Sequence, residues 1–212
     1  MVHVVLLGDS VFDNGAYIAG APDVVRQLRT HLPPGSQATL CAVDGYVTAN
    51  VPGQIHRIPS GATHLIVSAG GNDALHHMPV LDETANSMAA ALERLADIAA
   101  SFRQDYKAML EVVLAQGLPA AVCTIYDPRF PNYRLQRLAV TALSLFNSVI
   151  LREATQAGIP VIDLRLVCDD DRDYANPIEP SAQGGDKIAA VIARLVSDHD
   201  FLRRRSEIYV RP

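Results

Sequence analysis

Residues 65–77 read LIVSAGGNDALHH, and this stretch decides the fold class. The apolar run at its start is rich in β-branched residues, which is typical of a strand buried on both faces. Two glycines end the run and permit a tight turn, and the polar pair Asn72 and Asp73 follows directly. The segment therefore predicts a buried strand that delivers polar side chains to one edge of a sheet.

The same pattern of a short apolar run and a turn recurs along the chain, with helical periodicity in the gaps. The predicted strands are Val4–Leu7, Ala38–Val43, His64–Ser68, Ala120–Ile125 and Val161–Leu164. The predicted helices are Pro22–Thr30, Met88–Val113, Tyr133–Ala157 and Ala182–Val196. This alternation indicates an α/β fold, a three-layer α/β/α sandwich around a five-stranded parallel sheet. We expect one domain over residues 1–212, because no linker or repeat interrupts the pattern.

The composition narrows the classes of partner. A net charge of -5 gives no basic field, so we expect no nucleic-acid partner and no membrane partner. No apolar run predicts a membrane span, and MVHVVLLGDS lacks the basic and small-residue regions of a signal peptide. Cys41, Cys123 and Cys168 are widely spaced and form no CxxC pair, which argues against a zinc site or a disulfide framework. Together these features predict a cytoplasmic location.

The C-terminal segment FLRRRSEIYVRP, residues 201–212, combines arginines with apolar side chains. We expect such a segment to dock on the body of the protein or on a second subunit. Whether the protein forms a homo-oligomer is therefore left open by the sequence.

In open parallel sheets ligands bind beyond the carboxyl ends of the strands, so the turns after the strands are the candidate site. The first of these turns holds Gly8, Asp9 and Ser10. Gly8 permits a tight turn, and Ser10 just past it would be lifted to the edge where a substrate can reach it. A helix N-cap or an Asx turn explains the same residues locally.

The second and third turns carry hydrogen-bond donors. Gly45 leaves its backbone N–H open toward a ligand, although a plain turn glycine explains it equally. Asn72 offers a side-chain N–H, and Asp73 can anchor the loop by accepting bonds from backbone amides, as in a structural Asx turn. A donor fixed beside a serine is what an oxyanion hole requires, because it binds the charge that develops on a carbonyl oxygen.

Taken together, the motifs resemble those of the SGNH hydrolases, also called GDSL-type esterases. The resemblance rests on GDS at residues 8–10, Gly45, GGND at residues 70–73 and PSAQGGDKIA at residues 180–189, and it spans Val4 to Leu195. It implies a flavodoxin-like hydrolase fold with Ser10 as nucleophile. The Ser10 N–H, the Gly45 N–H and the Asn72 side chain would form the oxyanion hole. Asp9 and Asp73 would be structural, and no metal or organic cofactor would be needed.

The last block departs from that family. Where the family has Asp-x-x-His-Pro, this chain has Asn176-Pro177-Ile178-Glu179-Pro180, so both members of the acid–base pair differ. The paired change is coherent, because an Asp beside Glu179 would place two like charges together. Asn176 removes that conflict, and its amide can donate a hydrogen bond to the Glu179 carboxylate. Burial would raise the pKa of Glu179, whereas the following helix and Asn176 would lower it.

Other side chains compete for the role of base. His76 and His77 follow the GGNDAL turn on the edge that holds Ser10, although paired histidines at a helix start are commonly solvated. Asp173, in the acidic run CDDDRDY, can approach the site, with a solvated loop as the default.

The predicted function is acyl transfer from a small ester to water through an acyl-serine on Ser10, with Glu179 and Asn176 in the positions of base and orienting acid. The first alternative is a binding module that keeps the oxyanion pocket without turnover, since a serine without an effective base is a poor nucleophile. The second is a flavodoxin-like binder with unrelated chemistry. Residues 12–20, 46–58 and 74–81 are expected to line the pocket, and their composition favours a small or moderately apolar acyl group.

Overall fold

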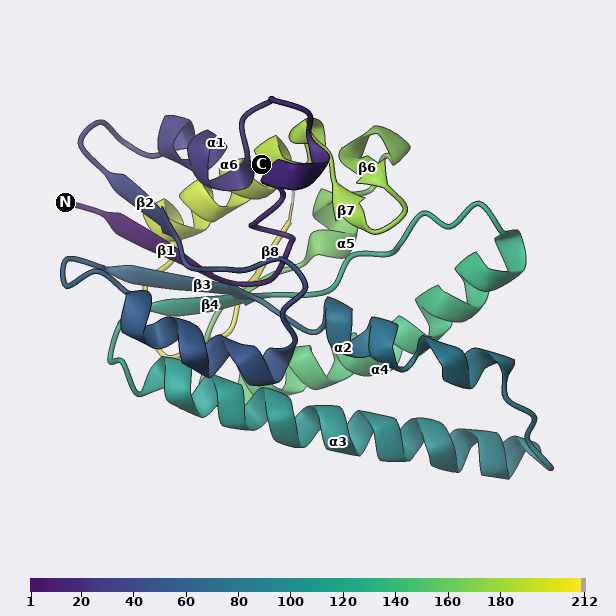
Figure 1. Cartoon of the computed structure of the whole chain (residues 1–212). Helices are drawn as coiled ribbons and strands as arrows, with labels where there is room; N and C mark the ends of the chain where they lie inside the picture. Colours follow the sequence, from purple (N-terminus) through teal and green to yellow (C-terminus); the bar gives the residue numbers. More distant parts are fainter. Residues whose placement is uncertain (211–212) are drawn as a thin grey trace.

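The computed structural model describes residues 1–210 and has a six-stranded parallel sheet at its centre (Figure 1). The strand order is β2-β1-β3-β4-β5-β8, so the sheet has one strand more than the sequence predicts. The strands are β1 (His3–Gly8), β2 (Gln37–Leu40), β3 (His64–Ser68), β4 (Ala120–Cys123), β5 (Val161–Ile162) and β8 (Ile208–Tyr209). The predicted α/β class and parallel sheet are confirmed.

Helices cover both faces of this sheet. One face carries α1 (Val24–His31) and α6 (Ala182–Asp198), and the other carries α3 (Met88–Leu114), α4 (Tyr133–Ala157) and the 3-10 helix η2 (Thr48–Arg57) (Figure 1). Shorter elements gather beyond the carboxyl ends of the strands. They are η1 (Gly15–Tyr17), α2 (Gly71–His76), η3 (Met78–Asp82), α5 (Leu164–Val167), η4 (Asp171–Asp173) and the antiparallel pair β6 (Tyr174–Asn176) and β7 (Glu179–Pro180).

The core is divided by the sheet into two apolar clusters. Successive side chains of a strand point to opposite faces, so Val4 and Leu6 of β1 pack with the α1 and α6 cluster. Val5 and Leu7 pack with the α3 and α4 cluster. Because both faces of β1 are covered, the strand has no polar side: residues 4–7 are fully buried.

Side-chain caps fix where the long helices begin. Ser87, Asn132 and Ser181 each accept a hydrogen bond from a backbone N–H in the first turn of α3, α4 and α6 respectively. At the other end, α4 stops at Gly158, whose φ of +67° suits a left-handed cap. These local signals explain why three of the four predicted long helices begin at or next to the expected residue.

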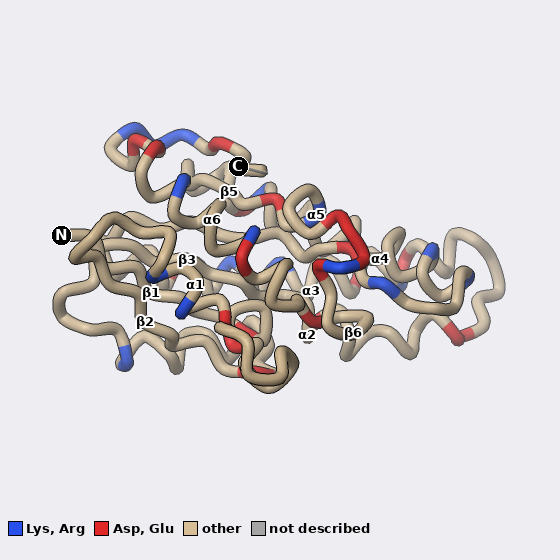
Figure 2. The backbone as a smooth tube through the Cα atoms, turned by 90° about the horizontal axis from the view of Figure 1, so that it is seen from above, with Lys and Arg blue, Asp and Glu red and all other residues tan. Residues whose placement is uncertain are grey.

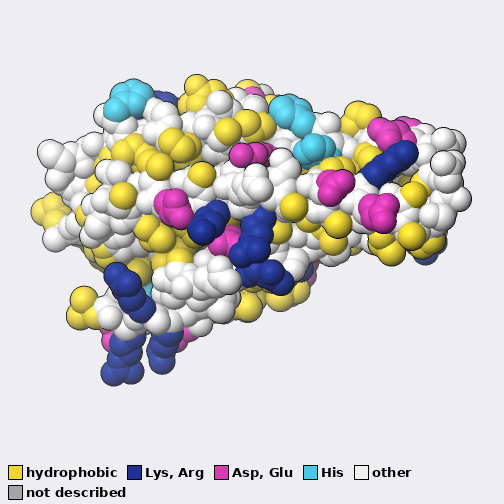
Figure 3. All heavy atoms as spheres, turned by 90° about the horizontal axis from the view of Figure 1, so that it is seen from below, with side chains coloured by type: hydrophobic (Ala, Val, Ile, Leu, Met, Phe, Trp, Pro, Cys, Tyr) yellow, Lys and Arg dark blue, Asp and Glu magenta, His cyan; other side chains and the backbone are white. Residues whose placement is uncertain are grey.

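The first turns of α3 project past the sheet (Figure 1). Met88 and Leu92 begin the apolar stripe that the sequence predicts, yet they are 76% and 57% exposed. The stripe reaches the core only from Phe102 onward, where Tyr106 and Met109 are also buried. Seen from below, apolar side chains are spread among charged and polar ones (Figure 3). The projecting end of α3 is therefore a wall at the carboxyl edge of the sheet rather than part of the core.

Helix α4 is long and apolar enough to cross a membrane by length and composition. In this structure it serves another purpose, because 44% of its most apolar window is buried inside the protein. Phe146, Val149 and Ile150 of α4 belong to the core cluster beneath the sheet. α4 is thus a core helix of the sandwich.

The C-terminal tail docks on the body of its own chain up to residue 210. Ile208 and Tyr209 form β8 beside β5, and Glu207 accepts a bond from the Tyr209 hydroxyl and contacts the His199 ring at 2.9 Å. Arg211 and Pro212 lie outside the described residues. Viewed from above, basic and acidic segments are interspersed along the backbone (Figure 2). Cys41, Cys123 and Cys168 are buried free thiols.

Candidate active site

The nucleophile loop begins where β1 presses against β3. Gly8 has a φ of +125°, and a Cβ at this position would lie 1.7 Å from the carbonyl oxygen of Ser68, so only glycine fits. The Gln54 side chain closes the strand end by accepting from the Gly8 N–H at 2.8 Å and donating to the Gly8 carbonyl at 2.7 Å. Gln54 is almost fully buried, and no sequence signal marks this role. The turn that holds Ser10 is therefore fixed from two sides.

Ser10 and Glu179 are brought together, as the sequence predicts. The Ser10 hydroxyl donates a hydrogen bond to Glu179 Oε1 at 3.1 Å, and each residue is 6% exposed. Glu179 begins the short strand β7, which pairs with β6 in a hairpin outside the main sheet. The contact joins the first and the last functional turns of the chain without an intervening histidine.

Three contacts hold the backbone around Glu179 in place. The Tyr126 hydroxyl donates to the Ile178 carbonyl at 2.6 Å, and the Arg129 N–H donates to the Pro177 carbonyl at 2.7 Å. The buried Asn14 amide donates to the Pro180 carbonyl at 3.3 Å. These contacts come from the β4–α4 connection and from the nucleophile loop. Asn14 follows the GDS turn in DNG, which is a polar signal that sequence reading could have noted.

The prediction for Asn176 is wrong in one respect. Its side chain is exposed and its Oδ1 accepts a bond from the Ile178 N–H at 2.9 Å, so its carboxamide stabilises the hairpin turn. Glu179 Oε2 has no hydrogen-bond partner among residues 1–210, so Asn176 does not orient the Glu179 carboxylate. The backbone of Asn176 lies opposite Glu179 in the hairpin, but the Asn176 side chain bonds the turn between them, at the Ile178 N–H.

Burial decides the charge state of Glu179. Removal from water raises its pKa to about 7, and the nearby Asp44 carboxylate adds to that rise. The hydrogen bond from Ser10 acts in the opposite direction and is the smaller effect. The sequence left the sum of these effects open; the structure gives a carboxyl group that changes its charge near neutral pH. Such a group suits a general base better than an ordinary glutamate does.

Asp9 and Asp73 anchor their turns, which confirms the structural roles expected for them. Asp9 Oδ1 accepts from the Val11 N–H at 3.1 Å, and Asp73 Oδ2 accepts from both the N–H and the hydroxyl of Thr48. Asp9 is 3% exposed, and burial is the main cause that raises its pKa to about 8. At neutral pH Asp9 is therefore largely a neutral acid.

The proposed oxyanion donors meet at the same edge. Asn72 Nδ2 donates to the carbonyl of Tyr46 at 2.9 Å, which fixes the amide next to Gly45 and leaves its second N–H available. Gly45 has a φ of +78°, in the region that favours glycine. Within residues 1–210, the backbone N–H groups of Ser10 and Gly45 have no carbonyl or side-chain acceptor. These N–H groups are therefore the candidate donors for an oxyanion that develops at Ser10.

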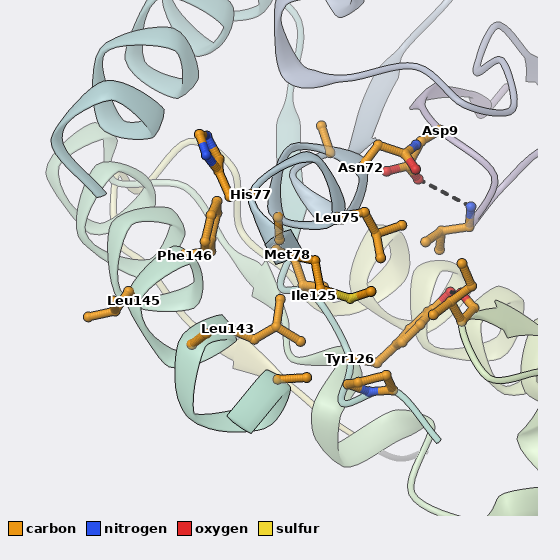
Figure 4. A pocket seen from close by; sticks show the side chains of 18 of the residues that line it. Asp9, Asn72, Leu75, His77, Met78, Ile125, Tyr126, Leu143, Leu145 and Phe146 are labelled. Atoms are coloured by element: carbon orange, nitrogen blue, oxygen red, sulfur yellow. Dashed lines mark hydrogen bonds between the residues drawn. The ribbon is translucent and has the colours of Figure 1, made fainter. Parts of the chain in front are cut away.

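The competing residues lie elsewhere. His77 lines the cavity beside Phe146, with ring centroids 6.4 Å apart, on the opposite side from Asp9 (Figure 4). His76 lies outside this cavity, and the Ser10 hydroxyl donates to Glu179 instead of to either ring. Asp173 is not the solvated loop residue expected from its run, because it is fully buried and pairs with Lys187 Nζ at 2.7 Å.

An apolar cavity extends from Ser10 and Glu179 between the projecting helices (Figure 4). Its empty volume is about 980 Å³, including the mouth that opens to solvent. The walls come from the α2–η3 segment, from α3, from the β4–α4 connection and from α4. The apolar side chains that line it include Leu75, Met78, Leu81, Leu95, Ile98, Ile125, Phe130, Ala142, Leu143 and Phe146. Of the three segments expected to line the pocket, only residues 74–81 do so.

Within the described residues, no group of three or more His, Cys, Asp or Glu side chains could hold a metal ion.

Comparison with known families shows to which family the chain belongs. The model of the GDSL-like Lipase/Acylhydrolase family matches residues 6–187, which includes the GDS turn, the GGND turn and the Glu179 segment. The chain belongs to the GDSL-like lipase/acylhydrolase family. No curated protein matches it.

Solved structures of lipases and related enzymes share the fold of this GDSL-like chain. An extracellular lipase from Streptomyces rimosus is 17% identical, covers 94% of this chain and 100% of its own, and gives a TM-score of 0.65. A phospholipase A1 from Streptomyces albidoflavus is 18% identical. The match covers 94% of this chain and 99% of the phospholipase, with a TM-score of 0.62. A lipase/acylhydrolase from Enterococcus faecalis is 18% identical. The match covers 92% of this chain and 95% of that protein, with a TM-score of 0.60. At these identities the likeness establishes the fold.

Proposed function

We propose that this GDSL-like protein is a serine esterase that hydrolyses esters with an apolar acyl chain through an acyl-enzyme on Ser10. The observation that carries the proposal is the 3.1 Å hydrogen bond from the Ser10 hydroxyl to Glu179 Oε1. A nucleophile in direct contact with a base whose pKa is about 7 meets the geometric and the acid–base requirements together.

The reaction follows from this contact. Ionised Glu179 accepts the Ser10 proton while Oγ attacks the acyl carbon, and the N–H groups of Ser10, Gly45 and Asn72 stabilise the oxyanion. When the C–O bond breaks, the alcohol leaves with the proton from Glu179. Glu179 then takes a proton from water, the resulting hydroxide attacks the acyl carbon, and Ser10 regains its proton as the carboxylic acid departs. The two half-reactions use the same carboxylate as base and as acid.

The cavity supports a longer acyl chain than the sequence suggests. Its walls are almost entirely apolar and begin at Ser10, so an acyl group bound to Oγ would extend between α3 and α4. Each buried methylene group contributes about 0.8 kcal/mol, so the chain length should control binding. Within the GDSL-like fold this cavity is the natural acyl site. The free buried cysteines support the further proposal of a reducing, cytoplasmic environment.

The decisive experiment traps the acyl-enzyme. Wild type should release p-nitrophenol from p-nitrophenyl esters and carry one acyl group on Ser10 by intact mass spectrometry after rapid acid quenching. Ser10→Ala should lose turnover by up to roughly 10⁶-fold. Ser101→Ala, on the exposed face of α3, is the matched control and should behave as wild type.

The alternative is a binding module, and the departure at residues 176 and 179 favours testing it. The double variant Asn176→Asp with Glu179→His restores the family pair. A double variant that hydrolyses esters while wild type is inert would reject the esterase proposal and support binding without turnover. Turnover in wild type that survives Ser10→Ala would reject the covalent route.

A further inference from the structure

The helix η2 is long for a 3-10 helix. It runs for ten residues, whereas 3-10 runs longer than about four residues are uncommon. Pro52 accounts for this geometry, because in an α-helix its ring would clash with the carbonyl of Thr48, four residues earlier. A 3-10 helix has three residues per turn, so residues 48, 51 and 54 lie on one face. They are the buried residues of η2.

The two ends of that face hold the two halves of the candidate site. Gln54 exchanges two hydrogen bonds with the backbone of Gly8, in the turn that carries the nucleophile. Thr48 donates to Asp73 Oδ2 from its backbone N–H at 2.9 Å and from its hydroxyl at 3.0 Å. Asp73 directly follows the candidate oxyanion donor Asn72. Because a 3-10 helix rises about 2 Å per residue, η2 spans about 12 Å between these two attachments.

The loop that precedes η2 is held between the same two turns. At its start the Val43 N–H donates to the Gly8 carbonyl at 3.1 Å. Near its end the Tyr46 carbonyl accepts from Asn72 Nδ2 at 2.9 Å. Gly45 lies between these two bonds. The position of the Gly45 N–H relative to the nucleophile turn therefore depends on the same framework.

Burial shows that the polar ends of this face are not needed for packing alone. Thr48 and Gln54 are 0% and 1% exposed, and buried polar side chains are costly unless they are bonded. Val51, between them on the same face, belongs to the apolar cluster that holds Val5 and Leu7. An apolar face would fill this space, so the two polar side chains serve the bonds to the catalytic turns.

We propose that Thr48 and Gln54 are positioning residues for ester hydrolysis, and that η2 is one rigid connector that keeps Ser10 in register with its oxyanion donors. The inference rests on the proposed esterase function, and it adds residues that act on the reaction through others. Neither Thr48 nor Gln54 lines the apolar cavity. Loss of either attachment should therefore lower kcat and leave KM almost unchanged, because it affects the transition state rather than the bound acyl chain.

The test measures steady-state hydrolysis of p-nitrophenyl butyrate. Gln54→Met keeps the shape and loses both bonds, so kcat should fall about 10²-fold, as a misplacement of about 1 Å can cause. Thr48→Val loses only the hydroxyl bond and should lower kcat about tenfold. Thr48→Ser restores the hydroxyl and should return kcat to within about threefold of wild type, with KM within about twofold throughout. A wild-type kcat in Gln54→Met and Thr48→Val would overturn the proposal.

A variant on the same helix face separates positioning from general loosening. Val51→Ala removes apolar contacts without touching a catalytic turn, so it should lower the urea midpoint of unfolding and keep a kcat near that of wild type. Gln116→Met and Thr141→Val repeat the two chemical changes at exposed positions and should behave as wild type. A loss of kcat in Val51→Ala as large as that in Gln54→Met would show that η2 acts only through stability, which contradicts the proposal.

The double variant Thr48→Val with Gln54→Met tests whether η2 acts as one connector. When one attachment is lost the register is already free, so the double variant should lose about as much kcat as Gln54→Met alone. A loss equal to the product of the two single losses would mean two independent anchors and would reject the connector.

Binding of butylboronic acid separates this inference from the esterase proposal. The Ser10 oxygen adds to boron and its proton passes to Glu179, which gives a tetrahedral anion that needs the nucleophile and the oxyanion donors in register. Calorimetric titration should show binding that Gln54→Met weakens about as much as it lowers kcat. Ser10-dependent hydrolysis that both positioning variants retain would sink the inference alone. Boronate binding that weakens in Gln54→Met, with no hydrolysis of any ester by wild type, would sink the esterase proposal alone.

Discussion

The hydroxyl of Ser10 donates directly to a carboxylate oxygen of Glu179 at 3.1 Å, across a separation of 169 positions in the chain. In a serine triad the imidazole takes the proton and a carboxylate stabilises the imidazolium. Here one carboxylate occupies the position of the base, and burial supplies what the missing imidazole would: a pKa of about 7.

Glu179 should control the pH dependence. We expect kcat/KM of wild type to rise with pH and to level off above about pH 7, because only the ionised carboxylate can accept the proton. Glu179→Gln keeps an acceptor for Ser10 but cannot be a base, so kcat should fall by roughly 10²–10⁴ and the acid limb should vanish. The pH–rate profile with a p-nitrophenyl ester measures both. Full activity in Glu179→Gln would exclude the carboxylate as base and return attention to His77.

Asn176 should matter less than Tyr126. Asn176→Ala removes an exposed hydrogen bond to the Ile178 N–H, so kcat/KM should stay within about threefold of wild type. The free energy of unfolding should fall by about 0.5–1.5 kcal/mol. Tyr126→Phe removes the donor to the Ile178 carbonyl next to Glu179, and we expect a loss of kcat of about tenfold from misplacement of the base. Steady-state kinetics and urea denaturation of the two variants test the order. The reverse order would mean that Asn176 orients Glu179 in solution.

Ala142 should determine which acyl chains are accepted. Its side chain lines the cavity from α4, so Ala142→Phe should shorten the accessible space and lower the octanoate-to-acetate ratio of kcat/KM by about tenfold or more. Ala100→Phe, on the exposed face of α3, adds the same volume outside the cavity and should keep the wild-type ratio. An unchanged ratio in Ala142→Phe would show that acyl chains bind elsewhere.

Asp9 should weaken the fold as pH rises. Its pKa is about 8 in the folded state and 3.8 unperturbed, so between these values the native state holds a proton that the unfolded state releases. The contribution of Asp9 to the free energy of unfolding is therefore fully present below about pH 4 and is lost as pH rises through 8. Asp9→Asn keeps the acceptor for Val11 without a charge, and we expect a flatter dependence in urea denaturation at pH 5 and 8. Asp105→Asn is the control, and a slope in Asp9→Asn equal to that of wild type would contradict the assignment.

The sequence predicts the sheet well, because buried parallel strands show continuous apolar runs. His64–Ser68 has the predicted bounds, whereas the strands that end at Leu40 and Ile162 stop earlier because their last residues turn into loops. β8 was missed because Ile208 and Tyr209 are too short a run to stand out, and their strand exists only through pairing with β5.

Within the site, the sequence indicates the residues that belong to local turn motifs, but it does not indicate the contacts between elements that are distant in the chain. Ser10, Asn72 and Glu179 are each marked by their turns, and the fold brings them to one edge. Gln54 holds Gly8 from the distant helix η2, a contact for which the sequence has no local pattern. The cavity likewise depends on how far α3 and α4 extend beyond the sheet, which periodicity does not reveal. The expected bond from Asn176 to Glu179 is absent because the Asn176 side chain accepts from the Ile178 N–H of its own turn, a local alternative that asparagine commonly takes.

The carboxamide of Asn14 has a mechanical consequence. One oxygen accepts the Val24 N–H at the start of α1, and the nitrogen of the same group donates to the Pro180 carbonyl beside Glu179. The buried Asn14 side chain thus links the nucleophile loop to the first helix and to the segment that carries Glu179. Opening of the hairpin that carries the base removes one of the two bonds that hold the Asn14 side chain, so we expect hydrogen exchange at the Val24 amide to rise when the hairpin opens. We therefore expect local opening around Glu179 to be coupled to fraying of the start of α1.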